Sequence, residues 1–185
     1  MENLKSNSIV SEEVKEKLDE NTLIVILYLI EKLDGVLGKT HLQKILFLTD
    51  LLSVKKFKKP ITNLQFEKNH YGPYCSEVNQ YIELLKNKKY VEAREFPLSN
   101  GAGIFVRYYF TGKDTSKKLL YKKITPEKIV LIDDVVSSYG NVSLQEILDV
   151  VYSLATVKES ENHTPLEMAK IINDDNEEVQ EIDIF

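Results

Sequence analysis

The sequence predicts a mainly α-helical protein with a small β hairpin, organised as a winged-helix-like core followed by C-terminal helices. Two observations lead to this fold class. Apolar residues recur at helical spacing both before residue 90 and after residue 126. Between these regions, two runs rich in β-branched and aromatic residues, 90–96 and 104–110, flank a loop at 97–103, as expected for a hairpin. Three helices followed by a two-stranded wing is the element order of a winged helix-turn-helix.

The first two helices of this core follow a polar, acidic arm at residues 1–21. Residues 22–33 (TLIVILYLIEKL) are apolar nearly all round, which is typical of a buried central helix. Residues 39–52 begin with Thr40, a suitable N-cap, and then carry apolar residues on one face. They predict a second, amphipathic helix.

The third helix is predicted over residues 75–88, directly before the hairpin. A basic loop at 55–60 and a short extended segment or loop at 61–69 precede it. Gly72 and Pro73 then form a turn, and proline is tolerated near a helix start because the first-turn amides need no partner within the helix. This turn sets the angle at which the third helix leaves the loop.

Three more helices are predicted after Pro126, over 127–138, 143–156 and 164–173. Ser143 and Thr164 each have a glutamate three residues later, which is the spacing of a capping box. The remaining residues are acidic and predict a loosely held tail. The chain thus divides into an N-terminal arm, a winged-helix-like core, a C-terminal helical part and an acidic tail, at 1–21, 22–125, 126–173 and 174–185.

The composition indicates a soluble cytoplasmic protein. A single cysteine excludes an internal disulfide and fits a reducing compartment. No N-terminal segment combines a basic start, an apolar run and a cleavage site, so secretion is not indicated. The apolar run at 23–30 is too short to span a membrane, and no membrane partner is expected.

The net charge of −5 is divided unevenly along the chain. Residues 1–38 carry four Lys/Arg and eight Asp/Glu, residues 39–128 carry 18 and eight, and residues 129–185 carry two and 13. The middle is therefore strongly basic and the C-terminal part strongly acidic. This segregation indicates either an oppositely charged partner or an acidic part that packs on the basic middle and cancels its field.

The sequence gives no positive case for an enzyme. Cys75 could be a nucleophile with His70 nearby if the following helix lowered its pKa, but its place in an apolar stripe favours a small buried side chain. His41 and His163 lie in unrelated segments without the spacing of a metal site. The Gly-Lys-Thr at 38–40 lacks the earlier glycine and the preceding strand of a phosphate-binding loop. Neither a cofactor nor a metal is expected.

A winged helix with a basic middle makes DNA binding an alternative function. The exposed face of the third helix argues against sequence-specific readout, because it carries Glu77 and Glu83 and has no arginine to read guanine. The candidate phosphate contacts are Lys55, Lys56, Lys58, Lys59, Lys88, Lys89, Arg94 and Arg107, with Lys86, Lys117, Lys118, Lys122 and Lys123 as further basic residues.

Two stretches together resemble a known family. "LQKILFLTDLL" (42–52) resembles a helix of the Panacea domain family, also called SocA-like, and "YGPYCSEV" (71–78) resembles its Gly-Pro turn. Residues 143–171 are similar to its C-terminal helical portion, so the resemblance covers about 22–172. Tyr74 departs from the aliphatic residue that often follows the Gly-Pro, and the Tyr-Gly-Pro-Tyr form resembles a divergent branch of the family.

The resemblance implies a mainly helical antitoxin or adaptor that binds and neutralises a toxin protein. The leading interpretation is therefore a non-enzymatic protein-interaction module, with a DNA-binding regulator as the alternative and a cysteine-dependent enzyme as a more distant one. Tyrosines beside a rigid turn are favoured interface anchors. The partner-binding residues expected on this basis are Lys44, Tyr71, Gly72, Pro73, Tyr74 and Glu77, and assembly into a homo-oligomer stays open.

Overall fold

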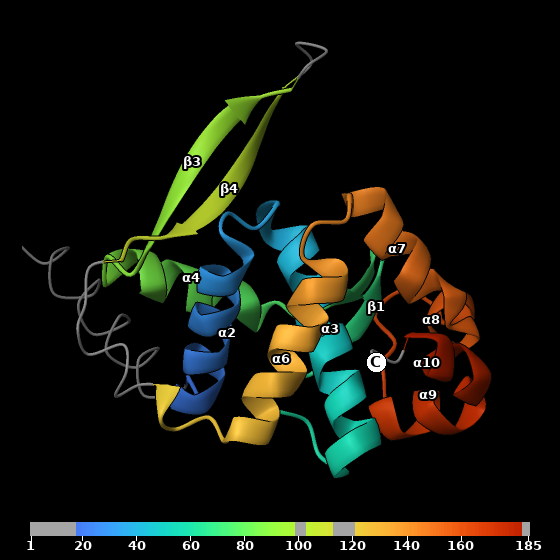
Figure 1. Ribbon diagram of the computed structural model, residues 1–185. Helices are drawn as coiled ribbons and strands as arrows, with labels where there is room; N and C mark the ends of the chain where they lie inside the picture. The colour runs from blue at the N-terminus through green and yellow to red at the C-terminus, as the bar shows by residue number, and fades with distance from the viewer. Residues whose placement is uncertain (1–17, 99–102, 113–120, 183–185) are drawn as a thin grey trace, which may run out of the picture.

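The computed structural model describes residues 18–98, 103–112 and 121–182. Within these ranges the chain forms eight helices and two antiparallel two-stranded sheets (Figure 1). The helices are α2 (Glu20–Leu33), α3 (Gly38–Phe57), α4 (Glu77–Asn87), α6 (Pro126–Tyr139), α7 (Leu144–Ser153), α8 (Ala155–Glu159), α9 (Met168–Asp174) and α10 (Asn176–Ile182). The strands are β1 (Glu67–Asn69), β2 (Gly72–Tyr74), β3 (Val91–Pro97) and β4 (Ile104–Phe110).

The mainly α-helical fold with a β hairpin is confirmed. The β1–β2 sheet was not predicted. Among the helices of the described ranges, none has the length and apolar character needed to cross a membrane. The predicted N-terminal arm falls almost wholly outside the described residues, apart from the few that lead into α2.

Helix α2 begins two residues before the predicted helix because Asp19 caps it. The Asp19 carboxylate accepts hydrogen bonds from the backbone N–H and the hydroxyl of Thr22, at 2.6 and 2.7 Å. Every residue from Ile24 to Ile30 is buried. The prediction of a buried, apolar first helix is therefore confirmed.

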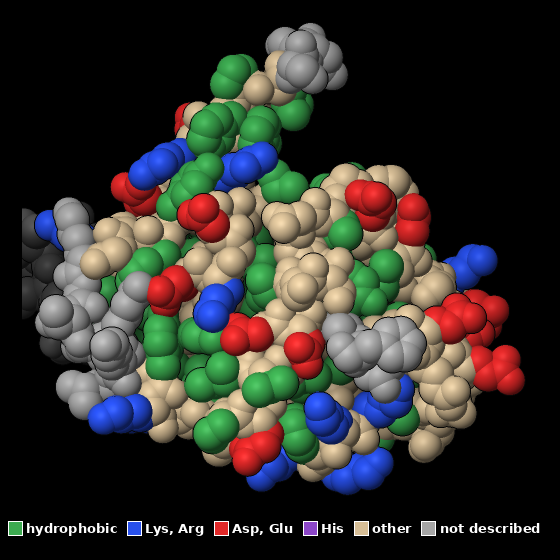
Figure 2. Space-filling model, viewed as in Figure 1, with side chains coloured by type: hydrophobic (Ala, Val, Ile, Leu, Met, Phe, Trp, Pro, Cys, Tyr) green, Lys and Arg blue, Asp and Glu red, His purple; other side chains and the backbone are tan. Residues whose placement is uncertain are grey.

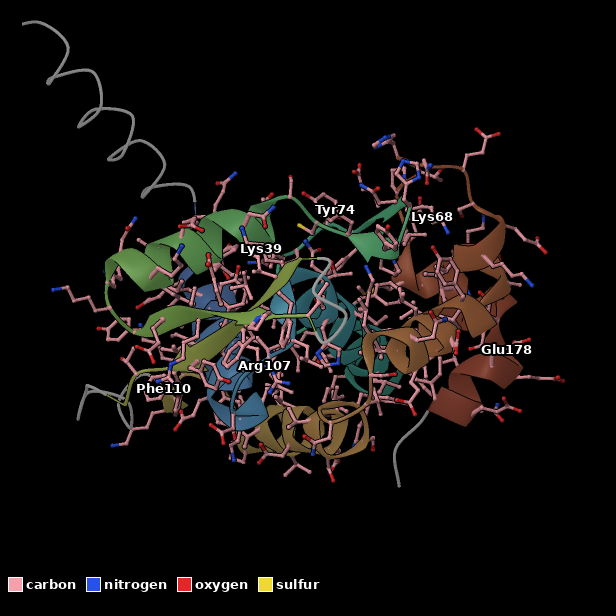
Figure 3. The ribbon with its side chains drawn as sticks, turned by 90° about the horizontal axis from the view of Figure 1, so that it is seen from above. Lys39, Lys68, Tyr74, Arg107, Phe110 and Glu178 are labelled. Atoms are coloured by element: carbon pink, nitrogen blue, oxygen red, sulfur yellow. The ribbon has the colours of Figure 1, made fainter. Side chains whose placement is uncertain are left out.

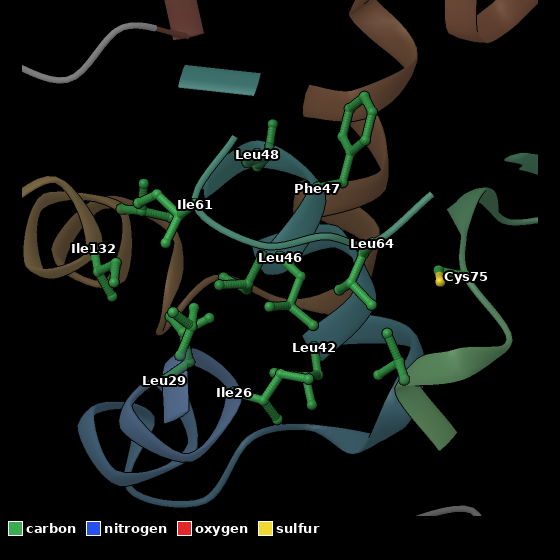
Figure 4. Packing of buried hydrophobic residues seen from close by; sticks show 14 of the residues in the cluster. Ile26, Leu29, Leu42, Leu46, Phe47, Leu48, Ile61, Leu64, Cys75 and Ile132 are labelled. Atoms are coloured by element: carbon green, nitrogen blue, oxygen red, sulfur yellow. The ribbon is translucent and has the colours of Figure 1, made fainter. Parts of the chain in front are cut away.

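Helix α3 is the central helix, and the prediction that it is amphipathic is wrong. Its residues 41–53 are all buried, because α6, α7, α9 and strands of both sheets contact it on different sides. Figure 4 shows Leu42 and Leu46 of α3 facing Ile26 and Leu29 of α2. The helix also continues into the segment predicted as a basic loop, since it ends only at Lys58, which is left-handed with φ 60°.

Asp50 holds the loop after α3 against the helix. Its carboxylate is buried and accepts hydrogen bonds from the backbone N–H groups of Ile61 and Thr62, at 2.8 and 2.9 Å. It also accepts a hydrogen bond from the Thr62 hydroxyl. Burial raises the pKa of Asp50 to about 6, although these hydrogen bonds oppose the shift.

The segment read as a turn into the third helix is a strand. Gly72 and Pro73 belong to β2, which pairs with β1 in the register Glu67–Tyr74 and Asn69–Gly72. The turn lies one step earlier, at His70 and Tyr71. Helix α4 then starts at Glu77, close to its predicted position.

Strand β1 has a second neighbour, the segment 163–166, in which Pro165 forms an antiparallel bridge with Glu67. Lys68 N–H donates to the carbonyl of Thr164 at 2.8 Å, and His163 N–H donates to the carbonyl of Lys68 at 2.7 Å. Leu166 N–H donates to the Phe66 carbonyl at 2.8 Å. The predicted capping box at Thr164 is wrong, because α9 begins only at Met168 and its N-cap is Glu167.

The predicted hairpin is confirmed as β3–β4, which projects from the helical body in Figure 1. Val36, between α2 and α3, pairs with Tyr108 through two backbone hydrogen bonds of 3.2 Å and anchors the base of the hairpin. The ring of Tyr109 lies over Gly35, where a Cβ would meet it at 2.5 Å. Gly35 also has a left-handed φ of +108°. Both the backbone conformation and the contact with Tyr109 therefore exclude a side chain at this position.

The C-terminal helices differ from the prediction at two positions. The predicted helix 143–156 begins with the expected Ser143 capping box but breaks at Leu154 into α7 and α8. The break is stabilised by Asp175, whose carboxylate accepts from the Thr156 N–H in the first turn of α8. The tail predicted to be loosely held contains α10, which buries Val179 and Ile182.

Candidate functional site

The two motif stretches of the sequence meet in space at one corner of the molecule. Gln43 of α3 reaches the junction between β2 and α4, where its amide group pairs with both backbone groups of Cys75. The Cys75 N–H donates to Gln43 Oε1 at 2.6 Å, and Gln43 Nε2 donates to the Cys75 carbonyl at 3.1 Å. Lys44, the next residue, donates from Nζ to the carbonyl of Pro73 at 2.7 Å. We call residues 70–77 the Gly-Pro corner.

Gly72 allows this corner to pack closely on α7. Its φ is +78°, a left-handed value that favours glycine. A Cβ on Gly72 would lie 3.3 Å from Val151 Cγ2, 3.7 Å from Tyr152 Cζ and 3.8 Å from Lys44 Cε. The Tyr152 hydroxyl also donates to the His70 carbonyl at 3.0 Å, so the turn is held from the same side.

Two lysine side chains are buried beneath the corner. Lys44 and Lys68 are 2% and 7% exposed. The Lys68 ammonium lies 4.2 Å from the centre of the Tyr152 ring, in a cation–π contact. Burial, together with the positive charge of Lys68, lowers the pKa of Lys44 to about 7.

Three predicted partner-binding residues reach the surface, and three are held inside the corner. Tyr71 is 66% exposed at the tip of the turn. Glu77 is exposed and Tyr74 half-buried, with the Tyr74 hydroxyl accepting from Asn79 Nδ2 at 3.2 Å. The remaining three, Lys44, Gly72 and Pro73, are buried, and the contacts given above join them to the protein itself.

A pocket of about 250 Å³ opens between the corner and the start of α3. In Figure 3, Lys39, Tyr74 and Lys68 lie along the same side of the molecule. The pocket brings together four of the predicted partner-binding residues with residues that had no predicted role. It is lined by Lys39, Thr40, Gln43, Lys44, Asn69, Tyr71, Gly72, Tyr74 and Asn79.

The structure does not pair Cys75 with His70. Cys75 is 3% exposed, and burial raises the pKa of its thiol, so the reactive thiolate is disfavoured. His70 faces Asn162 instead, with 3.3 Å between His70 Nδ1 and Asn162 Nδ2. Within the described part of the chain, no group of His, Cys, Asp and Glu is arranged to hold a metal ion.

His41 is buried at the start of α3, and burial lowers the pKa of its ring. The Val142 backbone opposes this shift, but neither ring nitrogen has a described partner with good hydrogen-bond geometry. His163 lies elsewhere, with its Nδ1 3.3 Å from a Glu67 carboxylate oxygen. The three histidines thus stand in separate environments.

The predicted phosphate contacts are distributed over both ends of the molecule. Figure 1 shows the hairpin at one end and the C-terminal end of α3 at the other, and a 20-residue helix is about 30 Å long. The four lysines 55, 56, 58 and 59 belong to the α3 end, whereas Lys88 and Lys89 follow α4 near the base of the hairpin. Figure 2 likewise shows Lys and Arg side chains on the hairpin and, separately, at the opposite edge.

The two arginines of the hairpin are engaged with their own aromatic neighbours. Arg94 pairs with Glu92 and lies 4.5 Å from the Tyr109 ring centre. Arg107, opposite Arg94 in the sheet, lies 5.9 and 5.6 Å from the ring centres of Phe96 and Phe105. Lys122 and Lys123 are exposed, with Lys123 paired to Glu20. Lys117 and Lys118 lie outside the described residues.

Gln43 and Lys68 support the Gly-Pro corner from α3 and β1, and the sequence analysis assigned no role to either residue. Gln43 is a polar residue in a largely apolar helical segment, residues 42–52. A polar side chain in such a segment signals a buried group that needs a hydrogen-bond partner. The sequence gives no comparable signal for Lys68, because its burial depends on β1 having neighbours on both sides.

The comparison with protein families identifies one family for this chain. The family model described as "Antitoxin SocA-like, Panacea domain" matches residues 42–156. This range is more than half of the 185 residues and includes both motif stretches, Gln43 with Lys44 and the Gly-Pro corner. A search of curated proteins found no significant match. The chain therefore belongs to the antitoxin SocA-like, Panacea-domain family.

Proposed function

We propose that this protein is a non-enzymatic antitoxin or adaptor that binds a toxin protein through the exposed side of the Gly-Pro corner. Membership in an antitoxin family implies a toxin–antitoxin role and a toxin partner. The observation that carries the proposal is Tyr71, which is 66% exposed on a turn whose backbone is fixed from behind. A large aromatic side chain on a rigid support is a favoured anchor, because little conformational entropy is lost when it is covered.

Tyr74 and Glu77 extend the same surface. Asn79 holds the Tyr74 hydroxyl, so this ring also has a defined position before a partner arrives. Glu77 contributes an exposed carboxylate at the start of α4. Together with Tyr71 they give the surface two aromatic side chains and one carboxylate.

DNA binding stays a second candidate because of one observation, the pairing of Val36 with Tyr108. It places an extended residue between the first two helices beside the hairpin, which supports a winged-helix arrangement of α2, α3, α4 and the wing. Against this function, α4 begins with Glu77 and carries Glu83, and the basic residues do not gather on one face with it.

The docking proposal is tested with the product of a neighbouring gene that is toxic when expressed alone. Tyr71→Ala should weaken binding of this toxin by at least about 1 kcal/mol and reduce growth rescue. The matched control is Val130→Ala, since Val130 is 53% exposed on α6, away from the corner. Its effect should stay within about 0.5 kcal/mol.

Wild-type affinity for the toxin in both Tyr71→Ala and Tyr74→Ala would show that the docking surface does not lie at this corner.

A gel shift on the gene's own promoter at two salt concentrations tests DNA binding. Binding to one site that resists added salt would favour the regulator, because non-specific phosphate contacts weaken steeply with salt.

A further inference from the structure

The pocket beside the Gly-Pro corner has an unusual balance of charge. Two of its lining residues are lysines, Lys39 and Lys44, and no carboxylate is among the residues that line it. The Glu83 carboxylate, outside the lining, lies 3.9 Å from Lys39 Nζ, at half-exposed side chains, whereas Lys44 is buried. Lys68 adds a third positive charge close to Lys44, which is why it affects the pKa of Lys44. A concave site with charge of one sign concentrates ligands of the opposite sign.

The Lys44 ammonium has hydrogen-bond donors without a described partner and lacks a described counter-charge. An ammonium has three donors, and the described structure shows one of them used, by the Pro73 carbonyl. Lys44 forms no ion pair with an Asp or Glu of the described residues. A buried charge without a counter-charge is destabilising, and a carboxylate beside it removes that cost.

Neutral polar groups surround the two lysines. Thr40, Asn69 and Asn79 contribute a hydroxyl and two amides to the lining, and Tyr74 contributes part of its side chain. Thr40 also belongs to the first turn of α3, which contains no acidic residue, so the positive end of the helix dipole adds to the field of the lysines. Such a donor-rich lining suits an oxygen acceptor.

The size of the pocket limits what it can hold. Clefts that bind drug-sized molecules have volumes of about 300–1,000 Å³, and this pocket has about 250 Å³. It is therefore matched to one side chain. Tyr71 is both part of the pocket lining and the most exposed aromatic residue of the proposed docking surface, so a partner that covers Tyr71 also covers the mouth of the pocket.

We infer that the pocket receives the carboxylate of a single Asp or Glu side chain presented by the partner protein, with Lys39 and Lys44 as its counter-charges. This inference rests on the docking function proposed above. The partner would thus contribute an acidic residue next to the surface that contacts Tyr71.

The first test uses the isolated protein and two blocked amino acids, N-acetyl-glutamate amide and N-acetyl-glutamine amide. They differ only in the charge of the side chain. Titrations followed by the backbone amide signals of Thr40 and Asn79 should show binding at least about tenfold tighter for the glutamate compound, as one charge-assisted hydrogen bond predicts. Lys44→Met should abolish this preference, and Lys39→Met should reduce it.

Lys158→Met is the matched control, because Lys158 is exposed on α8 and is not part of the pocket. Thermal unfolding establishes that each variant is folded. If Lys44→Met does not fold, the preference of Lys39→Met for the glutamate compound decides whether the pocket binds a carboxylate. Equal binding of the two compounds would overturn the inference, as would an unchanged preference in both pocket variants. Inorganic phosphate that binds as tightly as the glutamate compound would also overturn it, since the site would then be a general anion site.

The second test uses the toxin partner and separates this inference from the proposed function. Both Tyr71→Ala and Lys44→Met should weaken the complex. Weakening by Tyr71→Ala alone would overturn the carboxylate pocket and leave the docking surface in place. If neither change weakens the complex, the docking surface itself is wrong.

Discussion

Replacing Gln43 by methionine should destabilise the protein strongly, although methionine has nearly the same length and is apolar. The change removes both hydrogen bonds to the Cys75 backbone, of 2.6 and 3.1 Å, in a place where Gln43 and Cys75 are 2% and 3% exposed. A buried backbone group left without a partner costs about 1–3 kcal/mol. Only the Cys75 N–H is left unpaired, because its carbonyl still accepts from the Val78 N–H at 3.3 Å. With about 0.5–1.5 kcal/mol for the second lost hydrogen bond, the predicted cost is about 1.5–4.5 kcal/mol, a large part of the roughly 5–15 kcal/mol that stabilises a typical domain.

Urea unfolding followed by circular dichroism measures this cost. With a slope of about 2 kcal/mol per M, the midpoint should fall by about 0.7–2 M. Gln145→Met is the matched control, because Gln145 lies exposed on α7 and bonds only Asp149, one turn away; its effect should stay within about 0.5 kcal/mol. A midpoint for Gln43→Met as close to wild type as that of Gln145→Met would refute the reasoning, since water would then satisfy the Cys75 backbone.

Three further predictions follow from buried groups near α3. Gly72→Ala should lower the free energy of unfolding by more than the roughly 1–2 kcal/mol of a left-handed alanine, because its methyl also comes within 3.3 Å of Val151. For Asp50, whose pKa burial raises from 3.8 to about 6, the stabilising effect is complete below pH 3.8 and is lost as the pH rises through 6. Asp50→Asn should remove this loss of about 3 kcal/mol. Cys75 should react with a thiol reagent in the native protein only as fast as the corner opens, because it is 3% exposed.

The measurements are urea unfolding for Gly72→Ala, the same at several pH values for Asp50→Asn, and the rate of thiol modification for Cys75. An unfolding midpoint for Gly72→Ala equal to wild type would show that the corner adapts without strain. Parallel stability curves for wild type and Asp50→Asn between pH 4 and 7 would contradict the raised pKa. Modification of Cys75 at the same rate with and without denaturant would contradict its burial.

The parts of the fold that were predicted correctly are those that neighbouring residues determine. The capping box of Ser143 with Glu146 starts α7 where the sequence placed it. The run of β-branched and aromatic residues at 104–110 coincides with β4. In each case the signal and the structure lie within one turn or one strand, so local propensity and periodicity are sufficient.

The parts that were predicted incorrectly depend on distant partners. Gln43, Lys44 and Asp50 gave α3 an amphipathic pattern, but each is buried because another segment supplies its hydrogen-bond partners. Gly72 and Pro73 have the local pattern of a turn and were predicted to form one. They form a strand instead, and Lys44 of α3, about thirty residues earlier, donates to the Pro73 carbonyl. Such tertiary contacts override the local pattern.

The candidate site shows the same division. The exposed position of Tyr71 could be predicted, because a turn residue with a large side chain is seldom covered. The pocket could not be predicted from the sequence, since its walls come from three separate segments: α3, the β1–β2 sheet and α4. Its charge depends on Lys39 and Lys44 lying side by side with residues that are 25–40 positions away in the chain.

The ribosome synthesises the two neighbours of β1 at very different times. Strand β2 follows within a few residues, whereas the segment that bonds Phe66 and Lys68 on the other edge ends at Leu166. At about 5–20 residues per second, a ribosome needs roughly 5–20 s to produce the intervening hundred or so residues. During that time one edge of β1 has unpaired backbone groups, which invite association with other chains. The corner that we propose as the docking surface is therefore completed only after residue 166 has been synthesised, about a hundred residues after β1 itself.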